Sequence, residues 1–319
     1  LAAPLQEVRT FNSDNKFDDG WTNKLIFGDN LMALKNLYED PKIKGRVKLI
    51  YIDPPFAKNK EFQRTKEQKA YQDKILGSKF IEYLRKRLVI LRELLAEDGS
   101  IYIHLDWKKV HYIKAIADEV FGEENFVREI IWRMGWISGY KSVANNWIRN
   151  HETLLFYAKN SDNYIFNKTY LPYAKGYERW GGRKKGQGLP IEDIWGVFEK
   201  EGVTSLAVVS FASQDTGYPT QKPEGLLARV IKASSNEGDI ILDAFAGAGT
   251  TLAVAEKLKR RWIGADCGKL AVYTMQKRLL NLREEIGNKG KSLKAKAFTL
   301  YNAGLYDWAE VKKLDFGHF

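Results

Sequence analysis

Short apolar runs alternate along the chain with stretches in which apolar residues recur every three or four positions. The apolar runs predict strands at about 48–52, 99–105, 153–158, 239–242 and 261–265. The helical spacing predicts helices at about 81–96, 110–120, 250–259 and 270–286. Strands that alternate with helices favour parallel βαβ units, so we expect an α/β fold with a doubly wound, mostly parallel sheet.

One stretch interrupts this alternation. From residue 160 to 213 the sequence is rich in Tyr, Trp, Gly and Lys and shows no sustained helical period. It is short for a free-standing domain, so we expect a loop-rich insert within a larger unit. The predicted organisation is an N-terminal extension (1–20), one half of the main domain (21–159), the insert (160–213), the other half (214–287) and a C-terminal extension (288–319).

The charge balance favours an anionic partner. The 319 residues carry 51 Lys and Arg against 40 Asp and Glu, a net charge of +11. Basic residues concentrate between Lys58 and Glu93, and again between Lys175 and Lys185, where Tyr and Trp stand among them. Cations neutralise phosphates and aromatic rings stack on bases, so nucleic acid is the favoured partner; a merely solvated surface is the alternative.

Other aspects of composition narrow the class of protein. No apolar run approaches the roughly 18 residues of a membrane helix. Cys267 stands alone, which excludes a disulfide framework and favours a reducing, cytoplasmic compartment. The four histidines, at positions 104, 111, 151 and 318, lack metal-ligand spacing, so we expect no metal site. His104 and Asp106, at the end of a predicted strand, are expected to be polar surface residues.

A glycine-rich turn links a predicted strand to a predicted helix at residues 243–251. Leu252 stands where the dinucleotide fingerprint needs a third glycine, and no lysine follows Gly249 as a triphosphate-binding loop requires. Asp266 ends the next strand, where an acid can accept hydrogen bonds from ribose hydroxyls. Asp243 is placed to hold a positive amino group. The pattern indicates a nucleoside ligand without phosphates, with a tight structural turn as the alternative.

A second turn, Asp53-Pro54-Pro55-Phe56, follows the strand at 48–52. The prolines withhold N–H donors and fix the direction of their carbonyls, Asp53 adds a carboxylate acceptor, and Phe56 adds a ring face. A flat group that bears an –NH₂ matches this set of acceptors. A stiff loop capped by a core phenylalanine is the alternative.

These two motifs together resemble those of the β group of DNA amino-methyltransferases. Asp53 to Phe56 resembles their catalytic motif, and Asp243 to Gly249 their S-adenosylmethionine (SAM) motif. Thr220-Gln221-Lys222-Pro223 and Gly28-Asp29-Asn30 resemble two flanking cofactor segments. The catalytic motif precedes the SAM motif, as in the β arrangement. The segments 21–30 and 50–57 look most like modification subunits of type III restriction systems. Many members carry Tyr where Phe56 stands, but stacking needs only the ring.

The resemblance implies a fold and a set of site residues. It implies a seven-stranded, Rossmann-like methyltransferase sheet, with catalysis in 21–159, SAM binding in 214–287 and target recognition in the insert. The implied catalytic residues are Asp53, Pro54, Pro55 and Phe56. The implied cofactor residues are Asp29, Asn30, Thr220, Lys222, Pro223, Asp243, Ala244, Phe245, Ala246, Gly247, Gly249, Thr250, Asp266 and Cys267; for Cys267, a buried small residue is an equal alternative. Candidate DNA contacts are Lys58, Lys60, Arg179, Arg183, Lys184 and Lys185, although a dimerisation or lid loop is the rival role for the insert.

The implied reaction is methyl transfer from SAM to the N6 amine of adenine in duplex DNA, on a base swung out of the helix. In this family Asp as the first catalytic residue goes mostly with adenine and Ser mostly with cytosine. Three alternatives stay open: an N4-cytosine DNA methyltransferase, an RNA amino-methyltransferase, and a non-catalytic DNA-binding module with a relict cofactor site. The resemblance points to double-stranded DNA in a prokaryotic cytoplasm as the partner, and it leaves a homodimer and a restriction subunit open.

Overall fold

The computed structural model describes residues 4–55, 78–134, 143, 145–171, 173, 186–196, 216, 218 and 221–304. Several residues singled out above lie outside these ranges: Phe56, Lys58, Lys60, Arg179, Arg183, Lys184, Lys185 and Thr220.

The helices and strands alternate through most of the chain. The helices are α1 (Asn30–Glu39), α3 (Ser78–Leu94), α4 (Val110–Phe121), the short η1 (Glu123–Asn125), α5 (Glu224–Ala233), α6 (Thr250–Lys257) and α7 (Lys269–Leu280). The strands are β1 (Gln6–Phe11), β2 (Asn23–Gly28), β3 (Val47–Ile52), β4 (Leu95–Leu105), β5 (Phe126–Arg133), β6 (His151–Ala158), β7 (Tyr170–Leu171), β8 (Leu189–Pro190), β9 (Ile194–Trp195), β10 (Ile240–Asp243), β11 (Arg261–Asp266), β12 (Arg283–Glu285), β13 (Lys289–Ser292) and β14 (Phe298–Ala303).

One mixed sheet organises the described part of the chain, in the order β1-β14-β2-β11-β10-β3-β4-β6-β5-β9. The six strands from β14 to β4 run parallel to one another, and β6 is antiparallel to β4 and to β5. The expected mostly parallel sheet is confirmed, but the expected number of seven strands is wrong, because this sheet has ten. The described parts of the two terminal segments supply the edge strand β1 and its neighbour β14, and the insert supplies β9 at the other edge.

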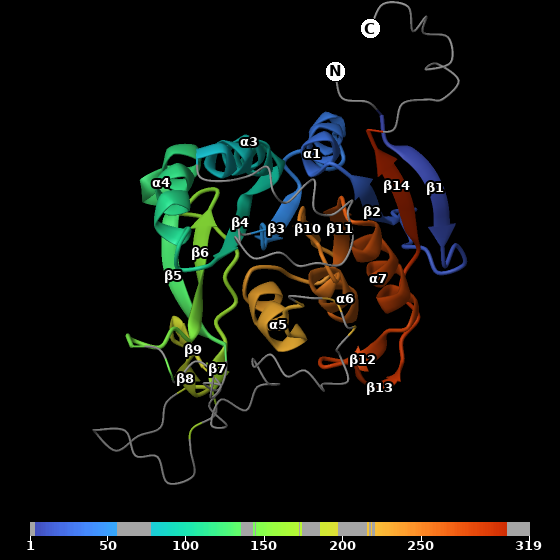
Figure 1. The fold of residues 1–319 in the computed structure, drawn as a ribbon. Coiled ribbons are helices and arrows are strands. Elements are labelled where there is room, and N and C mark those ends of the chain that lie inside the picture. The colour runs from blue at the N-terminus through green and yellow to red at the C-terminus, as the bar shows by residue number, and fades with distance from the viewer. Residues whose placement is uncertain are drawn as a thin grey trace, which may run out of the picture.

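Helices cover both faces of the sheet, which makes the fold doubly wound (Figure 1). On one face α1, α3 and α4 pack in a core that includes Leu34, Leu88 and Ile113. On the other face α5, α6 and α7 pack in a core that includes Leu227 and Met275. The three-and-four spacing of leucines in α3 puts its apolar face on the sheet, where burial removes it from water.

The path of the chain changes direction between β10 and β3, which are parallel neighbours with Leu242 opposite Ile50. From β10 the chain passes through α6 to β11 on one side, and from β3 through α3 to β4 on the other. In open α/β sheets the carboxyl ends of strands at such a reversal form the ligand crevice. The motifs at Asp53 and Asp243 follow or end these two strands, so they lie at the same edge of the sheet.

Some element boundaries differ from the sequence prediction. The helix expected at 270–286 ends at Leu280, because the chain then forms the β12–β13 hairpin. Gly287 and Asn288 adopt positive φ at its turn, and the Asn288 side chain accepts a hydrogen bond from the Arg283 N–H. Within the described residues no helix combines the length and apolar character needed to cross a membrane.

Candidate active site

The glycine-rich turn joins β10 to α6 and is held by the buried Asp243. The Asp243 carboxylate accepts hydrogen bonds from the Phe245 N–H (3.0 Å) and the Thr251 hydroxyl (2.6 Å). Burial raises the pKa of Asp243 to about 7, although these two bonds oppose the shift. Gly249 has φ +72°, and a Cβ there would lie 2.6 Å from Met275 Cγ, so only glycine lets the turn approach α7 this closely.

Asp266 connects this turn to the end of β11. One oxygen of its carboxylate accepts from the Gly247 N–H (2.9 Å) and the other from the Gly268 N–H (2.8 Å). Each carboxylate oxygen can accept a second hydrogen bond, so the half-buried group retains capacity for a ligand hydroxyl. Cys267 beside it is exposed, which rules out the alternative of a buried small residue.

Asp29 and Asn30 reach the same turn from α1. Asp29 caps the helix by accepting from the Leu31 N–H, and it pairs with Arg87 at 3.2 Å. The Asn30 amide donates to the Ala244 carbonyl at 2.8 Å, which ties α1 to the glycine-rich turn. The side chain of Arg87 is buried in this contact, so it belongs to the interior and not to an exposed basic surface.

Asp53 extends from the end of β3 and pairs with a lysine from a distant part of the chain. The Lys222 ammonium lies 3.0 Å from Asp53 Oδ2 and 3.1 Å from Glu152 Oε2. All three side chains are largely buried. Lys222 was expected at the cofactor, and its ammonium instead lies at the predicted catalytic aspartate. Pro54 is buried and Pro55 exposed.

Glu152, His104 and Tyr51 extend this cluster into the sheet, and the sequence did not reveal them. His104 Nε2 lies 3.0 Å from Glu152 Oε2, and His104 Nδ1 lies 2.6 Å from the Tyr51 hydroxyl. His104 has no exposed surface, so the expectation that it is a surface residue is wrong. Asp106 is also buried, and its carboxylate accepts hydrogen bonds from the N–H groups of Lys108 and Lys109 just before α4, so it is not a surface residue either.

The ionisation of this cluster follows from its contacts. Burial would raise the pKa of Glu152, but contact with His104 and the Lys222 charge outweigh it and hold that pKa well below its usual range. Burial, together with the Lys222 charge, lowers the pKa of His104, so the imidazole is neutral near pH 7. Burial opposes the charge on Lys222, but Asp53 and Glu152 outweigh it and raise the pKa of Lys222. The cluster therefore contains an ionised Glu152, a cationic Lys222 and a neutral His104.

The backbone of Lys222 contacts the other motif. Its carbonyl accepts a hydrogen bond from the Thr250 hydroxyl at 3.1 Å, and Thr250 begins α6 at the glycine-rich turn. Nearby, Tyr218 Cε1 lies 3.5 Å from the position that a Cβ on Gly247 would occupy. The segment before α5 thus lines the edge of the sheet between the two predicted motifs.

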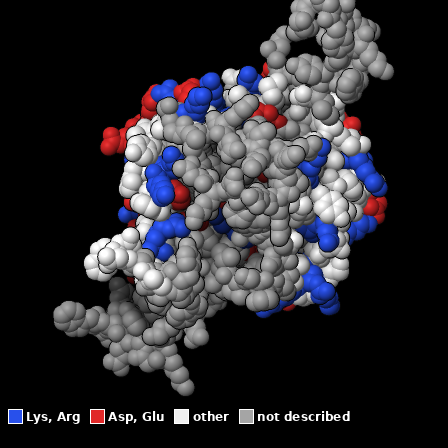
Figure 2. Space-filling model, in the orientation of Figure 1, with Lys and Arg blue, Asp and Glu red and all other residues white. Residues whose placement is uncertain are grey.

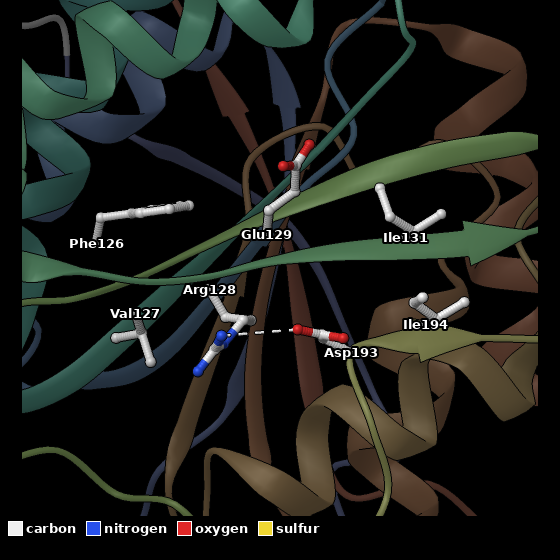
Figure 3. Close-up of a pocket in the computed structure, with 7 residues that line it drawn as sticks. All are labelled: Phe126, Val127, Arg128, Glu129, Ile131, Asp193 and Ile194. Carbon is white, nitrogen blue, oxygen red and sulfur yellow. Dashed lines mark ion pairs between the residues drawn. The ribbon is translucent and has the colours of Figure 1, made fainter.

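A separate hollow lies at the far margin of the sheet, on β5 and β9 (Figure 3). It is lined by Phe126, Val127, Arg128, Glu129, Ile131, Asp193 and Ile194. Arg128 and Asp193 form an ion pair across it at 3.7 Å. None of the residues predicted for catalysis or for cofactor binding lines this hollow.

The charges on the surface and the grouping of possible metal ligands both bear on the predictions. Lys and Arg side chains gather at the left, top and right of the face shown in Figure 2, with Asp and Glu among them. In the part of the chain that the structure describes, no three His, Cys, Asp or Glu side chains group in a way that could hold a metal ion.

Comparison with solved structures defines the class of fold. The chain is similar to M1.HpyAVI in complex with SAM (20% identity, TM-score 0.52), covering 80% of this chain and 98% of that one. It is also similar to the cytosine-N4-specific PvuII DNA methyltransferase (16% identity, TM-score 0.53), covering 80% of this chain and 86% of that one. The fold is therefore that of a methyltransferase.

Comparison with sequences then gives the family. The family described as DNA methylase, of the N6/N4 type, matches residues 47–277, and the chain belongs to this family. A relative is the type II methyltransferase M.EcaI of Enterobacter cloacae (28% identity, 83% of this chain, 71% of the relative). Others are the DNA adenine methyltransferase YhdJ of Escherichia coli K12 (29%, 76% and 77%) and the probable type III HindVI Mod subunit of Haemophilus influenzae (23%, 76% and 48%).

The protein is thus a SAM-dependent DNA methyltransferase, and the observed turn suits this cofactor. The glycines let the backbone of the turn lie close to a ligand. The half-buried carboxylate of Asp266 lies beside the turn, and no lysine follows Gly249. A carboxylate acceptor without a phosphate-binding lysine matches a nucleoside that has ribose hydroxyls and no phosphates.

Proposed function

We propose that the protein transfers a methyl group from SAM to the N6 amine of adenine in duplex DNA, after the target base has swung out of the helix. The observation that carries this proposal is the adjacency of β3 and β10, which puts Asp53 and the glycine-rich turn at one edge of the sheet. A base within a stacked duplex cannot reach such an edge, so extrusion is required.

Asp53 and Pro54 act in this proposal as acceptors for the amine protons. The amine nitrogen is a poor nucleophile because its lone pair is delocalised into the ring. Hydrogen bonds that draw its protons toward Asp53 and the Pro54 carbonyl favour a tetrahedral nitrogen with an exposed lone pair. Asp53 Oδ2 faces Lys222, and Oδ1 has no partner among the described residues, so it is available to the amine. Stacking of the base on Phe56 stays a prediction.

The cofactor residues divide into those that contact the ligand and those that shape its turn. SAM supplies the methyl group on its sulfonium. We propose that Asp266 accepts from the ribose hydroxyls and that the backbone around Gly247 lies against the ligand. Asp243 already accepts from Phe245 and Thr251, so its proposed role is to shape the turn. Asn30 supports the turn through the Ala244 carbonyl.

Recognition of DNA is proposed for the insert at 160–213, with the basic residues at 58, 60, 179 and 183–185 as phosphate or base contacts. A Mod subunit works within a type III restriction-modification enzyme, so the similarity to the HindVI Mod subunit supports a restriction subunit as partner. The protein would then act on DNA in a prokaryotic cytoplasm.

The choice of adenine rests on Asp53 and on the relative YhdJ, a DNA adenine methyltransferase. Mass spectrometry of nucleosides from DNA treated with protein and SAM tests it. N6-methyladenine is the expected product. N4-methylcytosine would replace the proposed substrate, preference for RNA in competition would replace duplex DNA, and absence of any labelled methyl transfer would favour the non-catalytic alternative.

A further inference from the structure

Lys222 contacts both predicted motifs directly. Its ammonium lies 3.0 Å from Asp53 Oδ2 on the catalytic side, and its carbonyl accepts from the Thr250 hydroxyl on the cofactor side. Pro223 follows it and precedes α5, which restricts the backbone on this side. Lys222 therefore links Asp53 to the glycine-rich turn, in addition to the pairing of β3 with β10.

Glu152 contacts the same ammonium. Glu152 lies near the amino end of β6, and its Oε2 atom is 3.1 Å from Lys222 Nζ and 3.0 Å from His104 Nε2. The ring of Trp132, which is buried, has its centroid 5.9 Å from Lys222 Nζ. Two carboxylates and an aromatic face thus restrict a flexible lysine side chain to one location.

We propose that Lys222, anchored by Glu152, is a positioning residue that fixes the Asp53 carboxylate for the amine of the target base. This inference rests on the proposed role of Asp53 as the amine acceptor. Neither residue contacts the transferred methyl group in this proposal; both act through Asp53.

Geometry and charge give the physical reason. Engagement of Oδ2 by Lys222 fixes the carboxylate plane and leaves Oδ1 for the amine. The cation also separates Asp53 from Glu152, because two ionised carboxylates in a shielded site repel each other. Misplacement of a reacting group by about 1 Å can cost about 100-fold in rate, so loss of this restraint would affect the transfer step.

The rival account is that Lys222 only stabilises the fold. The chain offers a matched control for this, because Lys257 is also a buried lysine paired with a glutamate, Glu224, at 2.7 Å. Lys257 lies on α6, and its ammonium pairs with Glu224 of α5. Lys257→Met is expected to lower the melting temperature while the rate of methyl transfer stays within about two-fold.

The decisive variant is K222M/E152Q, which removes the cation and one carboxylate together and so leaves less unpaired charge than Lys222→Met alone. We expect the single-turnover rate of methyl transfer to fall by about 10- to 100-fold, while the Kd for SAM stays within about three-fold of the wild-type value. Lys222→Arg keeps the positive charge, so its rate is expected to lie between those of K222M/E152Q and the wild type. In an Asp53→Ala background, loss of Lys222 is expected to remove little further activity, because both act through one carboxylate.

The outcomes separate the two proposals. A K222M/E152Q rate within about two-fold of the wild type, while Asp53→Ala is inactive, overturns the positioning role and leaves the proposed function intact. Full turnover in Asp53→Ala overturns the proposed function itself. Should K222M/E152Q not fold, Glu152→Gln decides, because it preserves volume and the Asp53–Lys222 pair: a slower transfer step at unchanged SAM affinity supports the proposal, and an unchanged rate overturns it.

Discussion

The molecule contains two buried lysine–carboxylate clusters, and their surroundings differ. Lys257 joins Arg278 on Glu224, with all three side chains almost fully buried among α5, α6 and α7. Lys222 joins Asp53 to Glu152 at the carboxyl edge of the sheet, where each side chain keeps some exposure. The same pairing chemistry thus joins helices in one place and lies at the edge of the sheet that carries the two predicted motifs in the other.

The charge balance differs in the same way. Burial lowers the pKa of Lys257, and contact with Glu224 does not outweigh it, in part because the Arg278 charge also lowers that pKa. Two carboxylates outweigh burial at Lys222 and raise its pKa. The Glu224 cluster thus pairs two cations with one carboxylate, whereas the Lys222 cluster pairs one cation with two carboxylates.

The largest expected effect is on the catalytic side. Asp53→Ala is expected to reduce methyl transfer by about 100- to 10,000-fold, because it removes the positioned acceptor for the amine. SAM affinity, measured by titration calorimetry, should stay within a few-fold. If Asp53→Ala turns over at the wild-type rate, the cluster of Lys222, Asp53 and Glu152 has no more catalytic role than the Lys257 cluster.

On the structural side, Glu224→Gln is expected to lower the free energy of unfolding by about 3–5 kcal/mol, because two buried cations lose their partner. Urea unfolding measures this. The control is Glu237→Gln, which removes an exposed ion pair with Lys259 and should cost less than about 1 kcal/mol. Equal costs for the two variants would contradict the structural role of Glu224.

The pH dependence of stability should be affected by Asp243. Its folded-state pKa is raised from 3.8 to about 7, so between these values the folded state binds more protons than the unfolded state. The contribution that favours folding is present below pH 4 and is lost as pH rises through 7. Stability of the wild type relative to Asp243→Asn should therefore fall by up to about 4 kcal/mol over this range, by urea unfolding without cofactor. A constant difference across pH would contradict a protonated buried Asp243.

The smallest effect in this set concerns the cofactor. Asp266→Ala is expected to weaken SAM binding by about 10- to 100-fold, since a hydrogen-bonded carboxylate contributes about 1.5–3 kcal/mol. The exposed Glu237, which precedes β10 and pairs with Lys259, provides the control, and Glu237→Gln should bind SAM within about two-fold of the wild type. An unchanged titration for Asp266→Ala would remove the ribose contact from the proposal.

The sequence predicted the parts of the fold that have strong local patterns. Strands β3, β10 and β11 and helices α3 and α4 were located because their apolar residues keep a clear period. Strands β1 and β14 were missed because their pairing joins residues far apart in the sequence, here Gln6 with Asn302, which no local pattern reveals.

The sequence predicted the parts of the site whose residues are adjacent in the chain. It did not predict contacts between residues that are far apart in the chain. The turns at Asp53 and Asp243 carry local motifs, but Lys222 pairs with Asp53, and Glu152 with Lys222, from segments far along the chain. His104 did leave a signal, since it interrupts an otherwise apolar strand, and a polar residue within a buried strand generally has a buried partner. No local rule could identify that partner as Glu152.

The central claim is that Asp53 and the glycine-rich turn share one crevice. A crystal structure with a non-reactive SAM analogue tests this most directly. We predict that the analogue contacts Asp266 and directs the position of its transferable carbon toward Asp53. Their separation should be roughly 6 Å, enough for one near-attack contact and one hydrogen bond through the amine. An analogue bound elsewhere, or with that carbon directed away from Asp53, would contradict the account.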